Sequence, residues 1–280
     1  MFFLRLLSRL PFPVLYAFSD FLFLITYYGV RYRRHLVIKN LQNAFPEDPV
    51  KTLKKYEKAF YRHLCDYAVE TIKLLTISTE ELKKRMVYKN PELVSEYANQ
   101  NQSVLLLTSH QFNWEWLLAS GCLYLPLQVD YVYQRQSSSL FDQFLISCRT
   151  RFGAYPIERS LLGREAVKRK DILRGIAIMA DQFPGREQDK KYWTEFMGQR
   201  TAFFLGLGQL AYMTQYPAIF YGVKRIKRGY YEAEGFLVSS PPYEKESQQS
   251  VEGYVKATEK IIRQQPDGWL WSHNRWKSRE

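Results

Sequence analysis

The sequence has few cysteines and histidines, and this scarcity excludes several classes of protein. The three cysteines, Cys65, Cys122 and Cys148, are odd in number and too far apart for a zinc knuckle or a redox pair. His35, His63 and His273 have no metal-ligating partner at a suitable spacing. We therefore expect no structural disulfide, no metal and a reducing compartment.

Internal repeats and low-complexity linkers are also missing. Apolar residues make up 46% and charged residues 24% of the 280 positions, which is close to the globular average and excludes both a disordered chain and a polytopic membrane protein. A chain of this length suits one large α/β domain or two small ones with a continuous buried core.

Acidic residues are outnumbered by basic ones, which points to an anionic partner. Lys and Arg total 40 against 28 Asp and Glu, so the formal charge is +12. Aromatic residues reach 16%, and large amphipathic rings are favoured where a protein meets a membrane interface. The chain carries no aromatic RNA-recognition signature. We therefore expect anionic membrane lipids, and no nucleic acid, as partners.

One apolar run near the amino terminus is a candidate membrane segment. Residues 10–30 are nearly long enough to cross a bilayer. Asp20 opposes a full span, because an acidic residue at a helix centre costs roughly 2.5–3.5 kcal/mol on insertion scales. Pro11 and Pro13 shorten the helical part. A tilted span and an interfacial helix both stay open.

Basic residues flank this run and predict its orientation. They are Arg5 and Arg9 before the run and Arg31, Arg33 and Arg34 after it. The richer basic flank follows the run, so we expect the rest of the chain in the cytoplasm. No small-residue cleavage site indicates a removable signal peptide. We predict a membrane-associated hydrophobic helix with basic flanks over residues 1–39 and the main domain over residues 40–280.

Short apolar runs alternate with helical patterns in the main domain. Strands are expected at residues 103–108, 129–133, 154–157, 175–180 and 218–226. Helices are expected at residues 47–76, 92–99, 114–123, 140–151, 163–173 and 202–214. A turn at residues 227–229 precedes a further strand at 230–236, which forms a hairpin. The pattern predicts an α/β fold with a mixed, mostly parallel central sheet flanked by helices.

Residues 108–115 follow the first buried strand and contain the strongest candidate for chemistry. Ligands and catalytic groups favour the carboxyl ends of strands in such sheets. Asn113 is a natural N-cap for the next helix. Across this turn, Glu115 is expected to accept a hydrogen bond from Nδ1 of His110 and leave the other ring nitrogen free as a base. On spacing alone, a histidine near an acid is more often structural than catalytic.

The run SHQFNWEWL at residues 109–117 resembles the H-x(4)-D/E motif of glycerolipid and lipid A acyltransferases, and its NWE form is typical of the late lipid A acyltransferase family. Further blocks resemble that family in the same order along the chain. They are residues 31–34 with NLQNAFP at 40–46, FGAYPIER at 152–159, DQFPGR at 181–186 and FMG at 196–198. Together they span about residues 10–276.

Two features depart from related patterns. Residues 199–206 read QRTAFFLG, where the family often has a Pro-Ala-Ala-Thr-Pro-x-Gly run, which leaves the preferred acyl length open. The F-P-E-G-T signature of phosphatidate-type acyltransferases is absent, which argues against that branch.

The resemblance implies acyl transfer from acyl carrier protein or coenzyme A to a hydroxyl of a lipid A precursor. His110 would act as general base and Glu115 would orient its ring. The acyl thioester is a co-substrate, and no cofactor is implied. The expected partners are acyl carrier protein, anionic membrane lipids and the lipid acceptor. The expected location is the cytoplasmic face of a bacterial inner membrane.

Three further residues are predicted to bind substrate, each with a structural alternative. Arg159 suits an acceptor phosphate or the carrier's phosphopantetheine, and is otherwise a surface arginine. Asp181 closes the strand at 175–180 and faces the same crevice, or only shapes a Pro-Gly turn. Asn113 is a weaker candidate, because capping explains it.

Other functions stay open on the sequence alone. The acceptor can be another lipid, such as a glycolipid, a phosphatidylinositol mannoside or an aminolipid. A thioester or ester hydrolase would use the same histidine to activate water, although no G-x-S-x-G nucleophile elbow supports one. A membrane-binding protein without catalysis is the remaining alternative.

Overall fold

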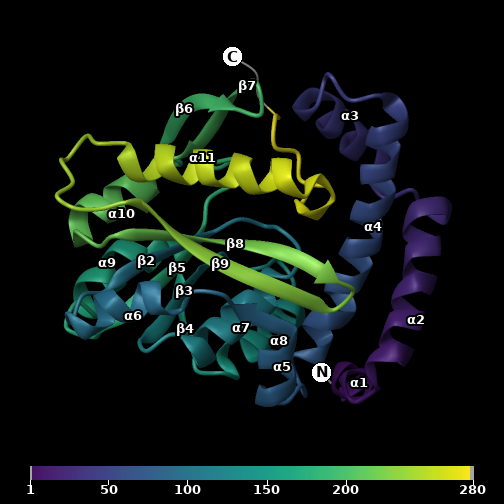
Figure 1. The fold of residues 1–280 in the computed structure, drawn as a ribbon, viewed down its shortest axis with the longest axis horizontal. Helices are drawn as coiled ribbons and strands as arrows, with labels where there is room; N and C mark the ends of the chain where they lie inside the picture. The colour runs from purple at the N-terminus through teal and green to yellow at the C-terminus, as the bar shows by residue number, and fades with distance from the viewer. Residues whose placement is uncertain (1, 278–280) are drawn as a thin grey trace.

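Seven strands form the central sheet in the computed structural model of the chain, which describes residues 2–277 (Figure 1). Their order is β1-β9-β8-β2-β5-β3-β4, and every neighbouring pair is parallel except β8 and β9. The strands are β1 (Met86–Tyr88), β2 (Val104–Thr108), β3 (Gln128–Tyr133), β4 (Tyr155–Glu158), β5 (Arg174–Met179), β8 (Ala218–Lys227) and β9 (Tyr230–Ser239). The prediction of a mixed, mostly parallel sheet is confirmed.

Helices cover both faces of the sheet because its central strands are apolar on both sides. In β2, Leu105 and Leu107 face one layer, and Val104 and Leu106 face the other. The first layer contains α3 (Arg34–Ala44), α9 (Leu162–Lys168), α10 (Gly206–Thr214) and α11 (Gln249–Gln264). The second contains α5 (Thr79–Arg85), α6 (Glu92–Asn99), α7 (Trp114–Tyr124) and α8 (Ser139–Thr150). This is a three-layer α/β arrangement.

The long helix α4 (Val50–Lys73) stands at one end of the molecule, beside the turn between β8 and β9 (Figure 1). The amino-terminal helices α1 (Phe2–Ser8) and α2 (Phe12–Phe23) follow its outer side. Pro11 caps α2, which continues through the π-helical turn η1 (Leu24–Gly29). Within residues 2–277, one helical run, Phe12–Gly29, is long and apolar enough to cross a membrane.

The predicted boundary between residues 39 and 40 falls inside α3, which runs from Arg34 to Ala44. Val37 and Leu41, on either side of that boundary, belong to one buried cluster together with residues of α4 and α11. The division of the chain into two parts stays a prediction.

A second, two-stranded sheet was not predicted. It consists of β6 (Lys191–Phe196) and β7 (Gln199–Phe204), so the helix expected at 202–214 begins only at Gly206. Met197 and Gly198 both have a positive φ, which forms the tight two-residue turn of a hairpin. Phe196 and Phe203 are buried with ring centroids 5.3 Å apart, so packing overrides helical preference here.

Candidate active site

The turn that follows β2 holds its shape through an unusual backbone conformation. Phe112 has φ of 51°, in the left-handed region that a bulky side chain rarely adopts. Its backbone nitrogen donates to the carbonyl oxygen of Gly268 at 2.8 Å, and a Cβ on Gly268 would overlap the Phe112 ring. Leu270 donates to the carbonyl oxygen of His110 at 3.0 Å. The segment after α11 therefore fixes a strained turn, as is common at functional sites.

Asp181, and not Glu115, is the carboxylate that contacts His110. Its Oδ1 lies 2.7 Å from Nδ1 of His110. Its Oδ2 accepts from the backbone nitrogen of His110 at 2.9 Å and from the indole of Trp269 at 2.8 Å. Burial alone would raise the pKa of Asp181, but the His110 charge and these donors lower it to about 2. An ionised Asp181 holds the proton on Nδ1, so Nε2 is free to accept one.

The prediction that Glu115 accepts a hydrogen bond from His110 was wrong. Glu115 lies in the first turn of α7, with its side chain 1% exposed, and pairs with Arg149 of α8. Two hydrogen bonds of 2.8 and 2.6 Å join them, and the Tyr67 hydroxyl donates at 3.3 Å. Asp181 reaches Nδ1 because β5 lies next to β2 and both strands end at the same edge. A catalytic role for Glu115 stays a prediction.

Asn113 serves as the cap of α7. Its Oδ1 accepts from the backbone nitrogen of Trp116 at 2.9 Å, as an N-cap does. Its Nδ2 donates to the carboxylate of Glu70 at 2.7 Å. The side chain is fully buried with both polar atoms engaged, and it does not line the cavity described next. Its predicted contact with substrate finds no support in this geometry.

A cavity of about 530 Å³ opens beside His110. Part of it lies between the sheet and α7 and is apolar. That part is lined by Leu106, Leu117, Leu118, Gly121, Leu125 and Ala177. Pairing between β3 and β5 stops at Tyr131 and Ala177, whereas β5 stays paired with β2 as far as Met179. Strands β3 and β5 therefore separate at their carboxyl ends, where the cavity opens.

Comparison with known families gives one result. The family model described as bacterial lipid A biosynthesis acyltransferase matches residues 1–278. The chain belongs to this family. Comparison with curated proteins finds no match. The predicted resemblance is confirmed, and the protein is an acyltransferase of lipid A biosynthesis.

The lining of the acyltransferase cavity also contains polar side chains, among them Arg159. Its guanidinium pairs with Asp189 and lies 4.9 Å from the centre of the Phe204 ring. Both charged residues line the cavity, so Arg159 is placed where a ligand can reach it, with 29% of its side chain exposed. Substrate binding by Arg159 stays a prediction. The other predicted substrate ligand, Asp181, is occupied by His110 and Trp269.

Sequence reasoning missed two residues of the acyltransferase site. The side-chain nitrogen of Gln182 lies 3.3 Å from Nε2 of His110. His273 accepts a hydrogen bond of 2.9 Å from the backbone nitrogen of Phe183, which holds the segment after Asp181. Burial lowers the pKa of His273 to about 4, so its ring is neutral and available as acceptor near neutral pH. The DQFPGR block contained a signal for Gln182, since it follows Asp181 directly.

Proposed function

We propose that the protein transfers a fatty acyl chain from an acyl thioester, on acyl carrier protein or coenzyme A, to a hydroxyl of a lipid A precursor, with His110 as general base. One observation carries this proposal. Nε2 of His110, which carries no proton in the tautomer that Asp181 fixes, faces a cavity whose lining is more apolar than polar.

The proposed reaction is a direct transfer from thioester to hydroxyl, with no covalent enzyme intermediate. Nε2 of His110 removes the proton of the acceptor hydroxyl while its oxygen bonds to the thioester carbonyl carbon. The tetrahedral intermediate then expels the sulfur, which takes the proton from the imidazolium and leaves as a thiol. Asp181 stabilises the imidazolium between these steps. Gln182 has an amide donor close enough to act on the oxyanion or the hydroxyl.

In this proposal the acyl chain lies in the apolar part of the cavity. The small size of Gly121, which lines that part, sets the longest acyl chain that fits. A Cβ on Gly121 would lie 2.8 Å from the Tyr88 hydroxyl, which itself donates to the Leu117 carbonyl. Gly121→Leu is expected to lower turnover of the longest accepted thioester at least tenfold relative to one four carbons shorter. Gly163→Leu, at an exposed helical position with open space, is the matched control. An unchanged length preference in Gly121→Leu would place the chain elsewhere.

The outer face of the amino-terminal helices is the proposed membrane contact. It exposes Phe2, Phe3, Leu6, Val14, Phe18, Phe21, Leu24, Ile25 and Tyr28. The inner face of α2 buries Leu15, Ser19 and Phe23. Helix α4, which packs against α2, carries exposed lysines such as Lys54. These charges would be unfavourable in hydrocarbon if α2 crossed the bilayer while packed on α4. This geometry favours an interfacial helix over a span.

Phe21→Asp is expected to weaken binding to phosphatidylglycerol-containing vesicles roughly tenfold, because a large exposed ring leaves the lipid and a charge replaces it. Vesicle flotation measures the bound fraction. Leu237→Asp removes a comparably exposed apolar side chain from β9 and should bind as the wild type does. Equal loss in both variants would indicate general charge repulsion and no specific membrane face.

The activity is tested with purified protein on vesicles. Radiolabelled acyl carrier protein and coenzyme A thioesters are offered separately, with and without a lipid A precursor. We expect label in the lipid only when the precursor is present, and none with His110→Ala. Thioester loss at the same rate without acceptor would support a hydrolase, and transfer to a different lipid would change the acceptor class.

A further inference from the structure

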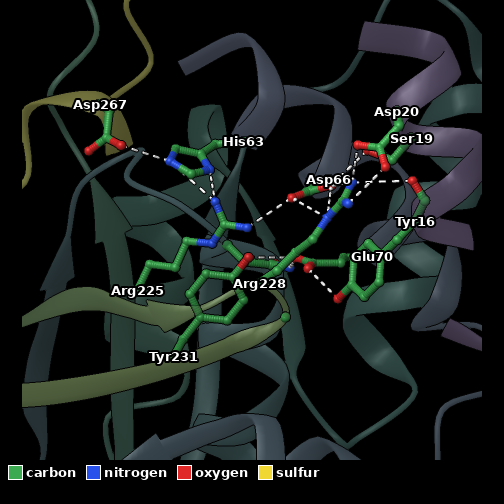
Figure 2. A network of polar contacts seen from close by, with 12 residues as sticks. Tyr16, Ser19, Asp20, His63, Asp66, Glu70, Arg225, Arg228, Tyr231 and Asp267 are labelled. Carbon is green, nitrogen blue, oxygen red and sulfur yellow. Dashed lines mark hydrogen bonds and ion pairs between the residues drawn. The ribbon is translucent and has the colours of Figure 1, made fainter. Parts of the chain in front are cut away.

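A stripe of ionisable side chains on α4 contacts the amino-terminal helix α2 and the strands β8 and β9 (Figure 2). His63, Asp66 and Glu70 are spaced three and four residues apart, so they lie along one side of the helix. Asp66 and Glu70 are at most 1% exposed. Such groups are costly to bury unless their hydrogen bonds are satisfied, and the partners come from several elements.

Asp66 links α2 to the turn between β8 and β9. It accepts from the Ser19 hydroxyl of α2 at 2.7 Å and from the guanidinium of Arg228 at 2.6 Å. Arg225 of β8 adds a third contact at 3.0 Å. Arg228 also donates to Asp20 of α2 at 2.8 Å. The polar side of α2 is therefore held by Asp66 of α4, which contacts Ser19, and by Arg228 of the β8–β9 turn, which contacts Asp20.

Glu70 links three other elements through its carboxylate. Its Oε1 accepts from the hydroxyl of Tyr16 of α2 at 2.8 Å. Its Oε2 accepts from Nδ2 of Asn113 at 2.7 Å and from the hydroxyl of Tyr231 of β9 at 2.8 Å. Burial and the charge of Asp66 raise the pKa of Glu70 to about 7. One buried carboxyl group thus bridges α2 and the cap of α7.

The position of Tyr16 depends on close packing as well. A Cβ at Gly229 would overlap the Tyr16 hydroxyl, and Gly229 has a positive φ of 73° at the tip of the β8–β9 turn. The Arg228 guanidinium lies 4.6 Å from the centre of the Tyr16 ring. The Tyr16 side chain is therefore closely packed against Gly229 and Arg228. A helix that served only as a lipid anchor would not need such packing.

We propose that α2 positions the catalytic turn through Tyr16, Glu70 and Asn113, so that full activity requires α2 seated on α4. The inference rests on the proposed acyl transfer. Asn113 lies three residues after His110 and caps α7, so its orientation fixes where the turn enters the helix. When α2 leaves α4, Glu70 loses the Tyr16 donor and is exposed to water. Tyr16 and Glu70 are positioning residues, since they act through Asn113.

The test compares Tyr16→Phe and wild type as full chains bound to phosphatidylglycerol-containing vesicles. Loss of one hydroxyl leaves the outer face of α2 unchanged. We expect kcat to fall roughly tenfold with KM for the thioester and vesicle binding unchanged. Hydrogen exchange of amides 109–116 should accelerate by a similar factor. Tyr192→Phe is the matched control, because its hydroxyl donates to the exposed Glu252 at 2.6 Å, and both readouts should stay at wild type.

A second variant changes the middle residue of the series Tyr16, Glu70 and Asn113. Glu70→Gln leaves one acceptor oxygen where the carboxylate has two, so Tyr16, Asn113 and Tyr231 cannot all donate to residue 70 in their present positions, and the same pair of effects is expected. Wild-type kcat and exchange in Tyr16→Phe would overturn the inference. So would reduced vesicle binding with full activity of the bound fraction, or a lower kcat without faster exchange. If the wild type transfers no acyl group, the proposed function is wrong. Hydrogen exchange of amides 109–116 in Tyr16→Phe and in the wild type then still tests whether α2 positions the turn.

Discussion

Asp181→Asn is expected to lower kcat by about 10³- to 10⁴-fold while the protein stays folded. An asparagine side chain can present its amide to Nδ1 of His110, which would place the imidazole proton on Nε2, the nitrogen that must accept one. The imidazolium would also lose the carboxylate that stabilises it. The substitution keeps the side-chain volume, so the contacts that pack around residue 181 remain.

Steady-state kinetics with a saturating thioester and lipid acceptor measure this effect. Thermal unfolding of the same sample shows whether the fold is intact. Asp171→Asn is a suitable control, because Asp171 is an exposed aspartate, and it should retain wild-type kcat. More than a tenth of wild-type kcat in Asp181→Asn would contradict the assignment of Asp181 as the partner of His110.

Arg149→Met is expected to lower the free energy of unfolding by about 3–5 kcal/mol, because it leaves a buried carboxylate without its partner. Glu115 is 1% exposed and takes two hydrogen bonds from Arg149. Its other donor, the Tyr67 hydroxyl, is neutral and lies 3.3 Å away. The pair therefore matters for stability whatever role Glu115 has in the reaction.

Urea unfolding measures this loss, and a double variant separates its cause. Glu115→Gln/Arg149→Met removes both charges, so it should be more stable than Arg149→Met alone. Arg263→Met breaks the exposed pair with Glu259 and should cost less than about 1 kcal/mol. A loss in Arg149→Met no larger than in Arg263→Met would show that Glu115 is satisfied without its partner.

The sequence predicted the central fold well because local patterns determine most of it. The buried strands β2, β3, β5 and β8 are short apolar runs, and each was expected within a residue or two of its observed bounds. The hairpin of β6 and β7 was missed because residues 202–204 are equally apolar in a helix or a strand. Its turn at Met197 and Gly198 was the available signal. Strand β1 has only three residues, too few for a pattern.

The site was predicted in outline but not in its contacts. His110 and Asp181 were both expected at the carboxyl edge of the sheet, and they meet there. Which carboxylate takes Nδ1 could not be predicted, since Glu115 is five residues from His110 and Asp181 is 71. Proximity in sequence favoured the wrong partner, whereas strand adjacency decides the right one.

Asp20 illustrates the same limit outside the active site. In the sequence it is an unfavourable charge inside an apolar run, and it argued against a membrane span. In the fold it pairs with Arg228, 208 residues away, on the side of α2 that faces α4 and the β8–β9 turn. The charge of Asp20 is therefore balanced by a partner that the sequence alone does not identify, because Arg228 belongs to a distant turn.

Lipid mass spectrometry of a Gram-negative host that lacks its own late acyltransferase tests the central claim most directly. The host is complemented with the wild-type chain or with His110→Ala, and equal membrane content of both proteins is verified. We predict one additional acyl group on lipid A with the wild type and none with His110→Ala. An additional acyl group that persists in His110→Ala, or unchanged lipid A with the wild type present, would contradict the account.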